Sequence, residues 1–285
     1  MTIIEERAPA KINLTLEVLG RRADGYHELR SLVAFAANAF DVVTLDTSRP
    51  AGCDVTGPFG GSIAGQNLIE LTLAKLAEVD AGLQLGHVTL TKNLPVAAGI
   101  GGGSADAAAV LRAVALCNPE RAAAIDWTAI ALSIGSDVPV CLQSRLSWMT
   151  GVGDSVTPVD PSLNDLHAVI ANPRVPVPAD KTAQVYRALR AAPLTDTAGR
   201  RLPDVKRDLV ASGRNALEPA AIEIVPEISD VLGDLAKLPG AKLTRMSGGG
   251  PTCFALFDTA EAAKRAAAEL SARRPAWWVA ASELE

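Results

Sequence analysis

Residues 95–106 read Pro95-Val96-Ala97-Ala98-Gly99-Ile100-Gly101-Gly102-Gly103-Ser104-Ala105-Asp106 and run directly into an apolar stretch that ends near Cys117. Apolar residues from Asp106 to Cys117 recur at helical spacing, so this is a loop that feeds a helix N-terminus. Four glycines let the backbone approach an anion, and the free amides and dipole of the helix favour negative charge. The stretch predicts a phosphate-binding loop; the alternative is a flexible glycine loop in which Ser104 merely caps the helix.

Two common phosphate-binding motifs are absent from the sequence. It contains no Gly-Lys dipeptide, which a Walker A loop requires, and no G-x-G-x-x-G pattern. The chain is therefore neither a P-loop NTPase nor a typical dinucleotide-binding protein.

The segments around this loop predict a mixed α and β protein. From Ala10 to Val18, apolar and polar residues alternate, which predicts a strand with one dry face. Asp126 is expected to cap a helix that ends at Ile134, with Gly135 in the left-handed conformation. Further strands are expected at 41–45, 88–90, 243–246, 253–257 and 277–280, and further helices at 67–79, 182–192, 228–238 and 260–272.

Length and composition predict a folded protein of two domains. A chain of 285 residues is long for one core, and the proline-rich segment 158–178 places the passage between domains at residues 157 and 158. With 48% hydrophobic and 21% charged residues, disorder is excluded. We expect domains at 1–157 and 158–285.

Charge and cysteine usage narrow the class of partner. The net charge is −5 and the positive residues are scattered, which argues against nucleic acid. No apolar run approaches the ~20 residues of a membrane span, and charges at residues 5–7 replace the apolar stretch of a signal peptide, so we expect a cytoplasmic protein. The four cysteines form no CxxC pair and the three histidines no metal pair, which disfavours zinc.

Four segments together resemble the GHMP kinase superfamily, and within it the family of 4-diphosphocytidyl-2-C-methyl-D-erythritol kinases. They are the glycine-rich stretch from Pro95 to Ser104, Pro9-Ala10-Lys11-Ile12-Asn13-Leu14, Ala23-Asp24-Gly25-Tyr26-His27-Glu28 and Gly135-Ser136-Asp137-Val138-Pro139-Val140. The resemblance implies an α+β fold of two domains. The N-terminal domain would be like ribosomal protein S5 domain 2, the C-terminal domain ferredoxin-like, and the active site would lie in the cleft between them.

The resemblance also implies an activity, the phosphorylation by ATP of the 2-hydroxyl of 4-diphosphocytidyl-2-C-methyl-D-erythritol in non-mevalonate isoprenoid biosynthesis. Asp137 would be the catalytic base, and Lys11 would stabilise its carboxylate and orient the hydroxyl. The alternatives are a turn aspartate bonded to local amides and a solvated strand lysine. A small-molecule substrate, no nucleic acid, no membrane, and a monomer or weak homodimer are expected.

The same resemblance assigns binding residues. Substrate contacts would come from Asn13, Tyr26, His27, Thr182 and Tyr186, and ATP contacts from Asn67, Lys92 and every residue from Pro95 to Ala105. Gly248, Gly249 and Gly250 resemble a third glycine turn near the phosphates. Mg²⁺ is expected to accompany ATP, with Ser104 as its one suggested protein ligand.

Four features depart from the family pattern. Ala105 stands where many relatives have a second serine, so no hydroxyl at this position can contact a metal or a phosphate. Gly249 stands where a hydroxyl residue is usual, and Pro251 removes a backbone donor. Residues 178–180 form an insertion ahead of Tyr186, which is expected to shift the cover of the cytosine base. The alternatives to the assigned activity are another GHMP kinase acting on homoserine, a sugar or a mevalonate derivative, and an inactive nucleotide-binding protein on the same fold.

Overall fold

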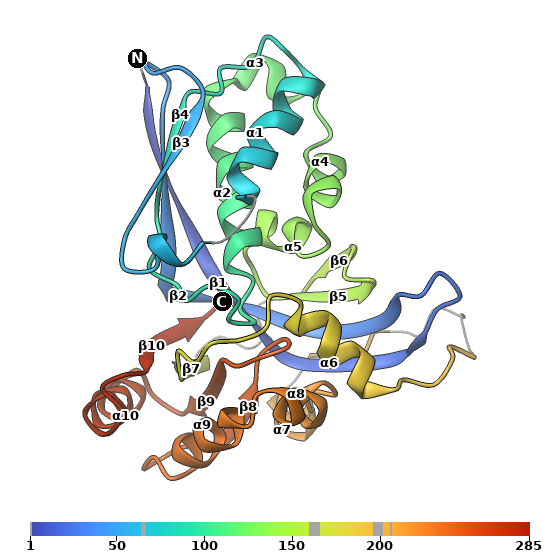
Figure 1. Cartoon of the computed structure of the whole chain (residues 1–285), viewed down its shortest axis with the longest axis vertical. Coiled ribbons are helices and arrows are strands. Elements are labelled where there is room, and N and C mark those ends of the chain that lie inside the picture. The colour runs from blue at the N-terminus through green and yellow to red at the C-terminus, as the bar shows by residue number, and fades with distance from the viewer. Residues whose placement is uncertain (1, 64–66, 160–165, 196–201, 206) are drawn as a thin grey trace. The chain divides into compact units, whose positions relative to one another are not determined.

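The computed structural model describes residues 2–63, 67–159, 166–195, 202–205 and 207–285 (Figure 1). Packing groups the chain into two compact units whose segments interleave along the sequence. The first unit is Met1–Ala10, Ala39–Val96 and Gly101–Ser144, and the second is Lys11–Asn38, Ala97–Ile100 and Arg145–Glu285. The division of the chain into domains at residues 157 and 158 stays a prediction, because these units group segments by packing rather than by chain order.

The first unit combines strands with a group of helices that lies on one side of them (Figure 1). The second half of β2 pairs antiparallel with β4, and β3 pairs parallel with β4. Helix α2 packs against α1 and α5. The elements are β3 (Gly52–Thr56), η1 (Gly60–Ser62), α1 (Leu68–Val79), β4 (His87–Thr91), α2 (Gly102–Cys117), α3 (Pro119–Ala122), α4 (Trp127–Ile134) and α5 (Val138–Gln143), with β1 (Ile3–Arg21) and β2 (His27–Asp46) contributing residues to both units.

Helices α1 and α4 of the first unit begin where the sequence indicates. Asp126 caps α4, its side chain accepting a hydrogen bond from the amide of Ala129 at 2.9 Å. The prediction of a left-handed Gly135 is wrong, since its backbone is extended at φ 177° and ψ 151°. The reason is the next helix: the amide of Val138 bonds the Gly135 carbonyl at 3.0 Å, so the chain turns directly into α5.

The second unit contains an antiparallel sheet in the order β10-β7-β9-β8, and β5 pairs with both β2 and β6. Helix α9 packs on β8 and β9, and α10 packs on β10 and β7. The elements are β5 (Ser147–Gly151), β6 (Ser155–Pro158), β7 (Leu166–Asn172), α6 (Lys181–Leu189), α7 (Arg207–Ser212), α8 (Glu218–Ile224), α9 (Glu227–Ala236), β8 (Leu243–Met246), β9 (Cys253–Phe257), α10 (Ala260–Arg273) and β10 (Trp278–Leu284).

Strand β1 confirms the strand predicted from Ala10 to Val18. The prediction that only one of its faces is buried is wrong. Lys11, Asn13 and Thr15, on the polar face, are 4%, 3% and 5% exposed. Their side chains are buried because other strands supply partners: the Asn13 amide nitrogen donates to Ser31 Oγ at 2.8 Å, and Thr15 Oγ1 accepts from the Leu32 amide at 3.2 Å. Both faces of β1 are dry over these residues.

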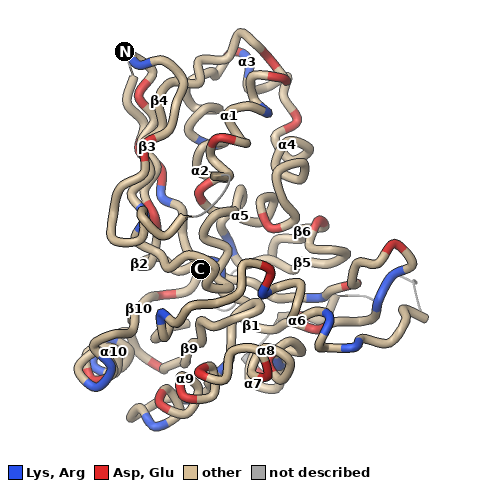
Figure 2. The backbone as a smooth tube through the Cα atoms, in the orientation of Figure 1, with Lys and Arg blue, Asp and Glu red and all other residues tan. Residues whose placement is uncertain are grey.

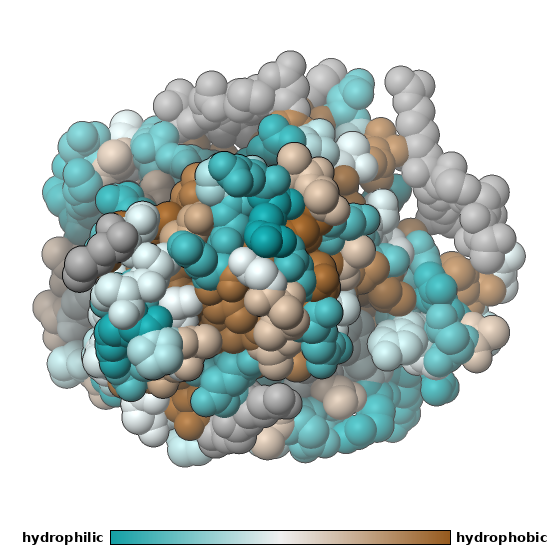
Figure 3. All heavy atoms as spheres, turned by 90° about the horizontal axis from the view of Figure 1, so that it is seen from above, coloured by the Kyte–Doolittle hydropathy of each residue, from teal (hydrophilic) through white to brown (hydrophobic). Residues whose placement is uncertain are grey.

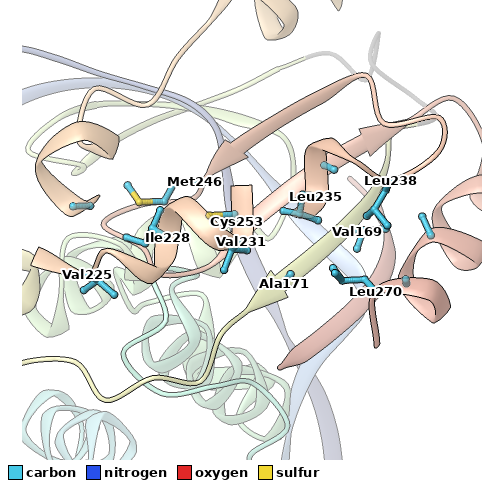
Figure 4. Close-up of a cluster of buried hydrophobic side chains, with 14 of the residues drawn as sticks. Val169, Ala171, Val225, Ile228, Val231, Leu235, Leu238, Met246, Cys253 and Leu270 are labelled. Atoms are coloured by element: carbon cyan, nitrogen blue, oxygen red, sulfur yellow. The ribbon is translucent and has the colours of Figure 1, made fainter. Parts of the chain in front are cut away.

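The hydrophobic core of the second unit lies between α9, α10 and the sheet (Figure 4). Ile228, Val231 and Leu235 follow one another at helical spacing along α9 and are fully buried. They contact a cluster that includes Val169 of β7 and Leu270 of α10. Apolar burial of this kind is the main favourable contribution to folding.

The exposed surface is mixed in character. In Figure 2 the backbone of α10 is coloured at both basic and acidic positions, whereas the buried positions of this helix are alanines and Leu270. On the face drawn in Figure 3, hydrophobic and hydrophilic residues are interspersed. Within the described residues, none of the helices has both the length and the apolar character needed to cross a membrane.

The core of the second unit predicts a stability difference between two leucines. Leu235→Ala removes a side chain that is 0% exposed, and we expect the free energy of unfolding to fall by about 2 to 5 kcal/mol. Leu116→Ala makes the same change at a side chain that is 60% exposed and should cost less than about 0.5 kcal/mol. Urea denaturation measures both; equal losses would contradict the assigned core.

Candidate active site

Two glycine-rich segments of the second unit touch through their backbones. Gly99 has φ +78°, and a Cβ added to it would lie 2.6 Å from the carbonyl oxygen of Gly250. Gly248 has φ +51°, and its Cβ would lie 2.6 Å from the carbonyl oxygen of Gly99. Real Cβ atoms do not approach so closely, so both positions require glycine.

Hydrogen bonds hold the segment 97–100 in this place. The amide of Thr252 donates to the Ala98 carbonyl at 3.2 Å, and Ser247 Oγ donates to the Gly99 carbonyl at 3.2 Å. The amide of Lys11, on β1, donates to the Ile100 carbonyl at 2.9 Å. The first glycine segment is thus fixed to both β1 and the second glycine segment.

The next residues of the loop begin α2 in the first unit. Gly101 is the N-cap residue, in the left-handed conformation with φ +63°, and the helix starts at Gly102. Ser104 therefore lies within the first turn and is not the cap, which removes the alternative of a merely capping serine. The first amides of a helix lack intrahelical partners and favour an anion. Phosphate binding by residues 95–105 stays a prediction, now with the expected loop and helix start in place.

A buried charged triad lies beside the start of α2 in the first unit. Lys92 Nζ is 2.6 Å from Asp41 Oδ2 and 2.6 Å from Asp106 Oδ2. Asp41 Oδ1 also accepts the amide of Leu94 at 2.8 Å. A Cβ on Gly102 would lie 3.1 Å from Lys92 Nζ, so the ammonium sits against the first residue of the helix. The predicted contact of Lys92 with ATP stays a prediction, beside this structural pairing.

Burial and mutual charge shift the pKa values of Lys92 and Asp106. Burial raises the pKa of Asp106, the Lys92 ammonium opposes this, and the Asp41 carboxylate adds to the rise. Burial lowers the pKa of Lys92, but the carboxylates of Asp106 and Asp41 outweigh it, so that pKa lies above its usual value. Asp106 Oδ1 is buried without a hydrogen-bond partner among the described residues. A proton held on Asp106 reduces the negative charge of this dry cluster.

The predicted catalytic residues lie in different units. Lys11 is on β1 in the second unit, 4% exposed, with Nζ 4.0 Å from Met149 Sδ. Asp137 is in the first unit at the N-cap position of α5, preceding Pro139 in the first turn. Within the described residues, its side chain makes no cap hydrogen bond to α5. The catalytic roles of both residues stay predictions.

Asn13 presents a buried acceptor that none of the described residues uses. Its amide nitrogen donates to Ser31 Oγ at 2.8 Å, while Oδ1 is buried and has no partner among the described residues. A Cβ on Gly248 would lie 3.5 Å from that oxygen, which places it beside the second glycine segment. An unsatisfied buried acceptor is costly, and a ligand hydroxyl or amine that donates to it removes the cost.

The predicted cytosine-binding residues are partly brought together. The rings of His27 and Tyr186 stack with centroids 4.8 Å apart and planes at 27°. If a base lay between the two rings, the rings would be about two stacking distances apart. They are closer than this, so they stack directly on each other. Tyr26 is 65% exposed, and its amide donates to Asp24 Oδ1 at 3.1 Å. The assignment of these three residues to the base stays a prediction.

The remaining predicted residues lie at element ends. Thr182 is exposed in the first turn of α6, with Oγ1 3.8 Å from a Cβ placed on Gly249. Asn67 caps α1, its Oδ1 accepting the Ile69 amide at 3.0 Å. Two hydrogen-bond partners of Asn13 were not predicted from the sequence: Ser31, and Ser247, whose Oγ accepts the backbone amide of Asn13 at 3.1 Å. They belong to segments distant in the chain, and a single serine carries no pattern.

The described residues show no protein cage for a metal. They contain no group of three or more His, Cys, Asp or Glu side chains placed to hold an ion. The carboxylate closest in sequence to Ser104, Asp106, is buried and paired with Lys92. Ser104 as a ligand of Mg²⁺ stays a prediction.

Both halves of the chain match models of one family. Residues 67–145 match the model described as GHMP kinases N terminal domain, and residues 184–276 match GHMP kinases C terminal. The 4-diphosphocytidyl-2-C-methyl-D-erythritol kinase of Methylobacterium radiotolerans is 47% identical over 98% of each chain. That of Azorhizobium caulinodans is 46% identical over 96% of each chain.

Solved structures agree with these relatives. A crystal structure of 4-(cytidine 5'-diphospho)-2C-methyl-D-erythritol kinase superposes with a TM-score of 0.77 at 34% identity, covering 98% of this chain and 99% of that one. Homoserine kinase from Cytophaga hutchinsonii gives a TM-score of 0.70 at 18% identity, covering 100% of this chain and 95% of that one. The second likeness shows the fold alone.

The triad predicts a pH-dependent stability that Asp106→Asn removes. The pKa of Asp106 is raised by folding, so the folded protein holds this proton more tightly than the unfolded chain does. Its contribution is therefore largest at low pH and declines as the pH rises above the ordinary aspartate range near 4. Relative to Asp106→Asn, we expect the wild-type free energy of unfolding to fall by up to about 1.4 kcal/mol per pH unit.

Urea denaturation at pH 6 and pH 9 measures this difference. Asp258→Asn makes the same change at an exposed aspartate and serves as the control, expected to keep the wild-type pH dependence. A difference between wild type and Asp106→Asn that is the same at both pH values would contradict a protonated Asp106.

Proposed function

The chain belongs to the GHMP kinase family, among its 4-diphosphocytidyl-2-C-methyl-D-erythritol kinases, and from this we propose how its residues carry out the reaction. It transfers a phosphoryl group from ATP to 4-diphosphocytidyl-2-C-methyl-D-erythritol in the non-mevalonate route to isoprenoid precursors. The acceptor is the 2-hydroxyl, and the products are the 2-phosphate and ADP. The observation that carries the residue assignment is the unsatisfied Oδ1 of Asn13 beside the two glycine segments.

Phosphoryl transfer requires positioning and charge stabilisation more than covalent chemistry from the protein. Asp137 accepts the proton of the attacking hydroxyl, and Lys11 stabilises the carboxylate and orients the alcohol. Burial of Lys11 at 4% exposure supports this role, because a dry ammonium interacts more strongly with charge than a solvated one. Asn13 Oδ1 accepts a hydrogen bond from the methylerythritol part of the substrate.

The glycine segments hold the phosphates of ATP. Close backbone contact between Gly99, Gly248 and Gly250 leaves peptide groups, without side chains, at this surface. The amides at the start of α2, after the left-handed Gly101, favour the same negative charge. Among the protein groups, the hydroxyl of Ser104 would lie beside any Mg²⁺ that accompanies ATP, and such an ion would neutralise part of the phosphate charge.

The cytosine base binds at Tyr26, His27 and Tyr186. Burial, with a smaller effect of the nearby Arg21 charge, lowers the pKa of His27, so the imidazole is neutral near pH 7. A neutral imidazole has one donor and one acceptor nitrogen, which complements an edge that both donates and accepts, as that of cytosine does. Because His27 and Tyr186 stack on each other, the base displaces one ring or stacks on an outer face of the pair.

We further propose a cytoplasmic enzyme that acts as a monomer or weak homodimer and has no nucleic-acid partner. The scattered positive charge and the net charge of −5 support the last point. An assay that offers the cytidyl substrate beside homoserine, galactose and phosphomevalonate tests the substrate class. Turnover of a non-cytidyl substrate alone would replace this assignment with another GHMP kinase activity.

Asp137→Asn tests the catalytic base. A positioned general base raises the rate roughly 100- to 10,000-fold, so we expect kcat of Asp137→Asn to fall by that factor while ATP still binds. Asp126→Asn is the matched control, because asparagine caps α4 as well as aspartate does. Near-normal kcat in Asp137→Asn would show that the base is another group or is unnecessary.

The protonation of His27 predicts a pH dependence for the cytidyl substrate. A lowered pKa means that the ring charges only as the pH falls below the ordinary histidine range near 6.5. We expect KM for the cytidyl substrate to rise below that pH, because the charged ring loses its acceptor, while KM for ATP stays level. His27→Gln keeps a donor and an acceptor without titrating, so KM for the cytidyl substrate should no longer rise at low pH. The same rise in this variant as in the wild type would contradict the assignment.

A further inference from the structure

Lys181, the first residue of α6, is a buried cation that the proposed reaction does not use. Its side chain is 3% exposed, although lysine is almost never fully buried unless paired. Nζ donates to the carbonyl oxygen of Ala97 at 2.9 Å and to that of Gly250. One ammonium therefore bridges the two glycine segments, within the second unit.

The charge of Lys181 is not balanced by a carboxylate within the described part of the chain. On α6, Asp180 pairs with Arg187 at 3.0 Å. On the neighbouring α8, Glu218 Oε2 accepts the amide of Met246 at 2.9 Å. The segments 97–100 and 247–252 contain no ionisable side chain. Burial accordingly lowers the pKa of Lys181 to about 8.

Hydrogen bonding leaves Lys181 one donor for a ligand. An ammonium has three N–H donors, and the described residues supply two acceptors, the carbonyls of Ala97 and Gly250. Ala97 itself is left-handed at φ +54°, which is rare for a residue other than glycine. The backbone is thus held in an uncommon conformation at the point where the ammonium meets it, as is frequent at ligand sites.

We propose that Lys181 binds a phosphate group at the junction of the two glycine segments, and so is a further substrate-binding residue. The inference rests on the proposed function for the source of that phosphate, which is either the ATP triphosphate or the diphosphate of the cytidyl substrate. Both have the same chemistry: an anionic oxygen that accepts the remaining N–H and neutralises the buried charge. A purely structural bridge would use the two carbonyls alone.

Phosphate binding to Lys181 predicts proton uptake. A bound anion favours the charged amine, so its pKa rises on binding. At pH 8 the free amine is about half protonated, and the complex takes up the missing fraction from solution. Affinity is highest below pH 8 and falls as the pH rises through that value.

Isothermal titration of ATP and of CDP, at pH 7, pH 8 and pH 9 and in buffers of different ionisation heat, tests the proposal. We expect Lys181→Met to lower the affinity for one of the two ligands roughly 10- to 100-fold at pH 7, because a hydrogen bond from a charged group is lost. Lys181→Arg, which stays charged, should bind at pH 9 as it does at pH 7. Lys242→Met is the control, at an exposed lysine of the same unit.

The affinities for ATP and for CDP distinguish the two possible sources of the phosphate. If Lys181→Met loses affinity for ATP, the phosphate that Lys181 binds belongs to ATP. If it loses affinity for CDP, that phosphate belongs to the cytidyl substrate. Unchanged affinity for both ligands in Lys181→Met, or ligand binding by the wild type without proton uptake at pH 8, overturns the proposal. Should Lys181→Met not fold, the wild-type uptake and the pH profile of Lys181→Arg decide it. Kinase turnover of the wild type is measured alongside, so a failure of the proposed function is seen separately.

Discussion

The two glycine-rich segments of the second unit are constrained by direct contact between the backbones of residues 97–100 and 247–250. Gly99 and Gly248 are fixed as glycine, because any Cβ would overlap a carbonyl of the other segment. Gly249 is different: a Cβ there would meet only Thr182 Oγ1 at 3.8 Å. The hydroxyl residue that the family pattern has at this position would therefore fit, so a lack of space does not explain the departure.

Much of the fold follows from local patterns in the sequence. The strands at 243–246 and 253–257 coincide with β8 and β9, because a glycine-rich turn separates two short apolar runs. Strand β7 was not predicted. It lies between β10 and β9 with most of its residues buried, so it lacks the alternation that identifies a strand, and prolines surround it.

The candidate site was predictable as a set of backbone segments and much less as a set of contacts. Glycine content and the following helix indicated the loop from Gly99 to Ser104, and Asn67 and Asp126 showed where helices start. The buried polar face of β1 was not predictable, since alternation shows that two faces differ but not that both are covered. Pairings such as Lys92 with Asp41 join strands far apart in sequence and depend on the tertiary fold.

Within the described part of the chain, two equally buried lysines differ in whether carboxylates lie beside them, and their pKa values shift in opposite directions. Lys92 and Lys181 are each 3% exposed, yet the pKa of the first is raised and that of the second is lowered. The first is held between two carboxylates, which stabilise its positive charge. The second is held by carbonyl dipoles, which stabilise a cation only partly in a dry environment. A phosphate oxygen at Lys181 supplies the missing negative charge, so ligand binding and relief of this buried cation are the same event.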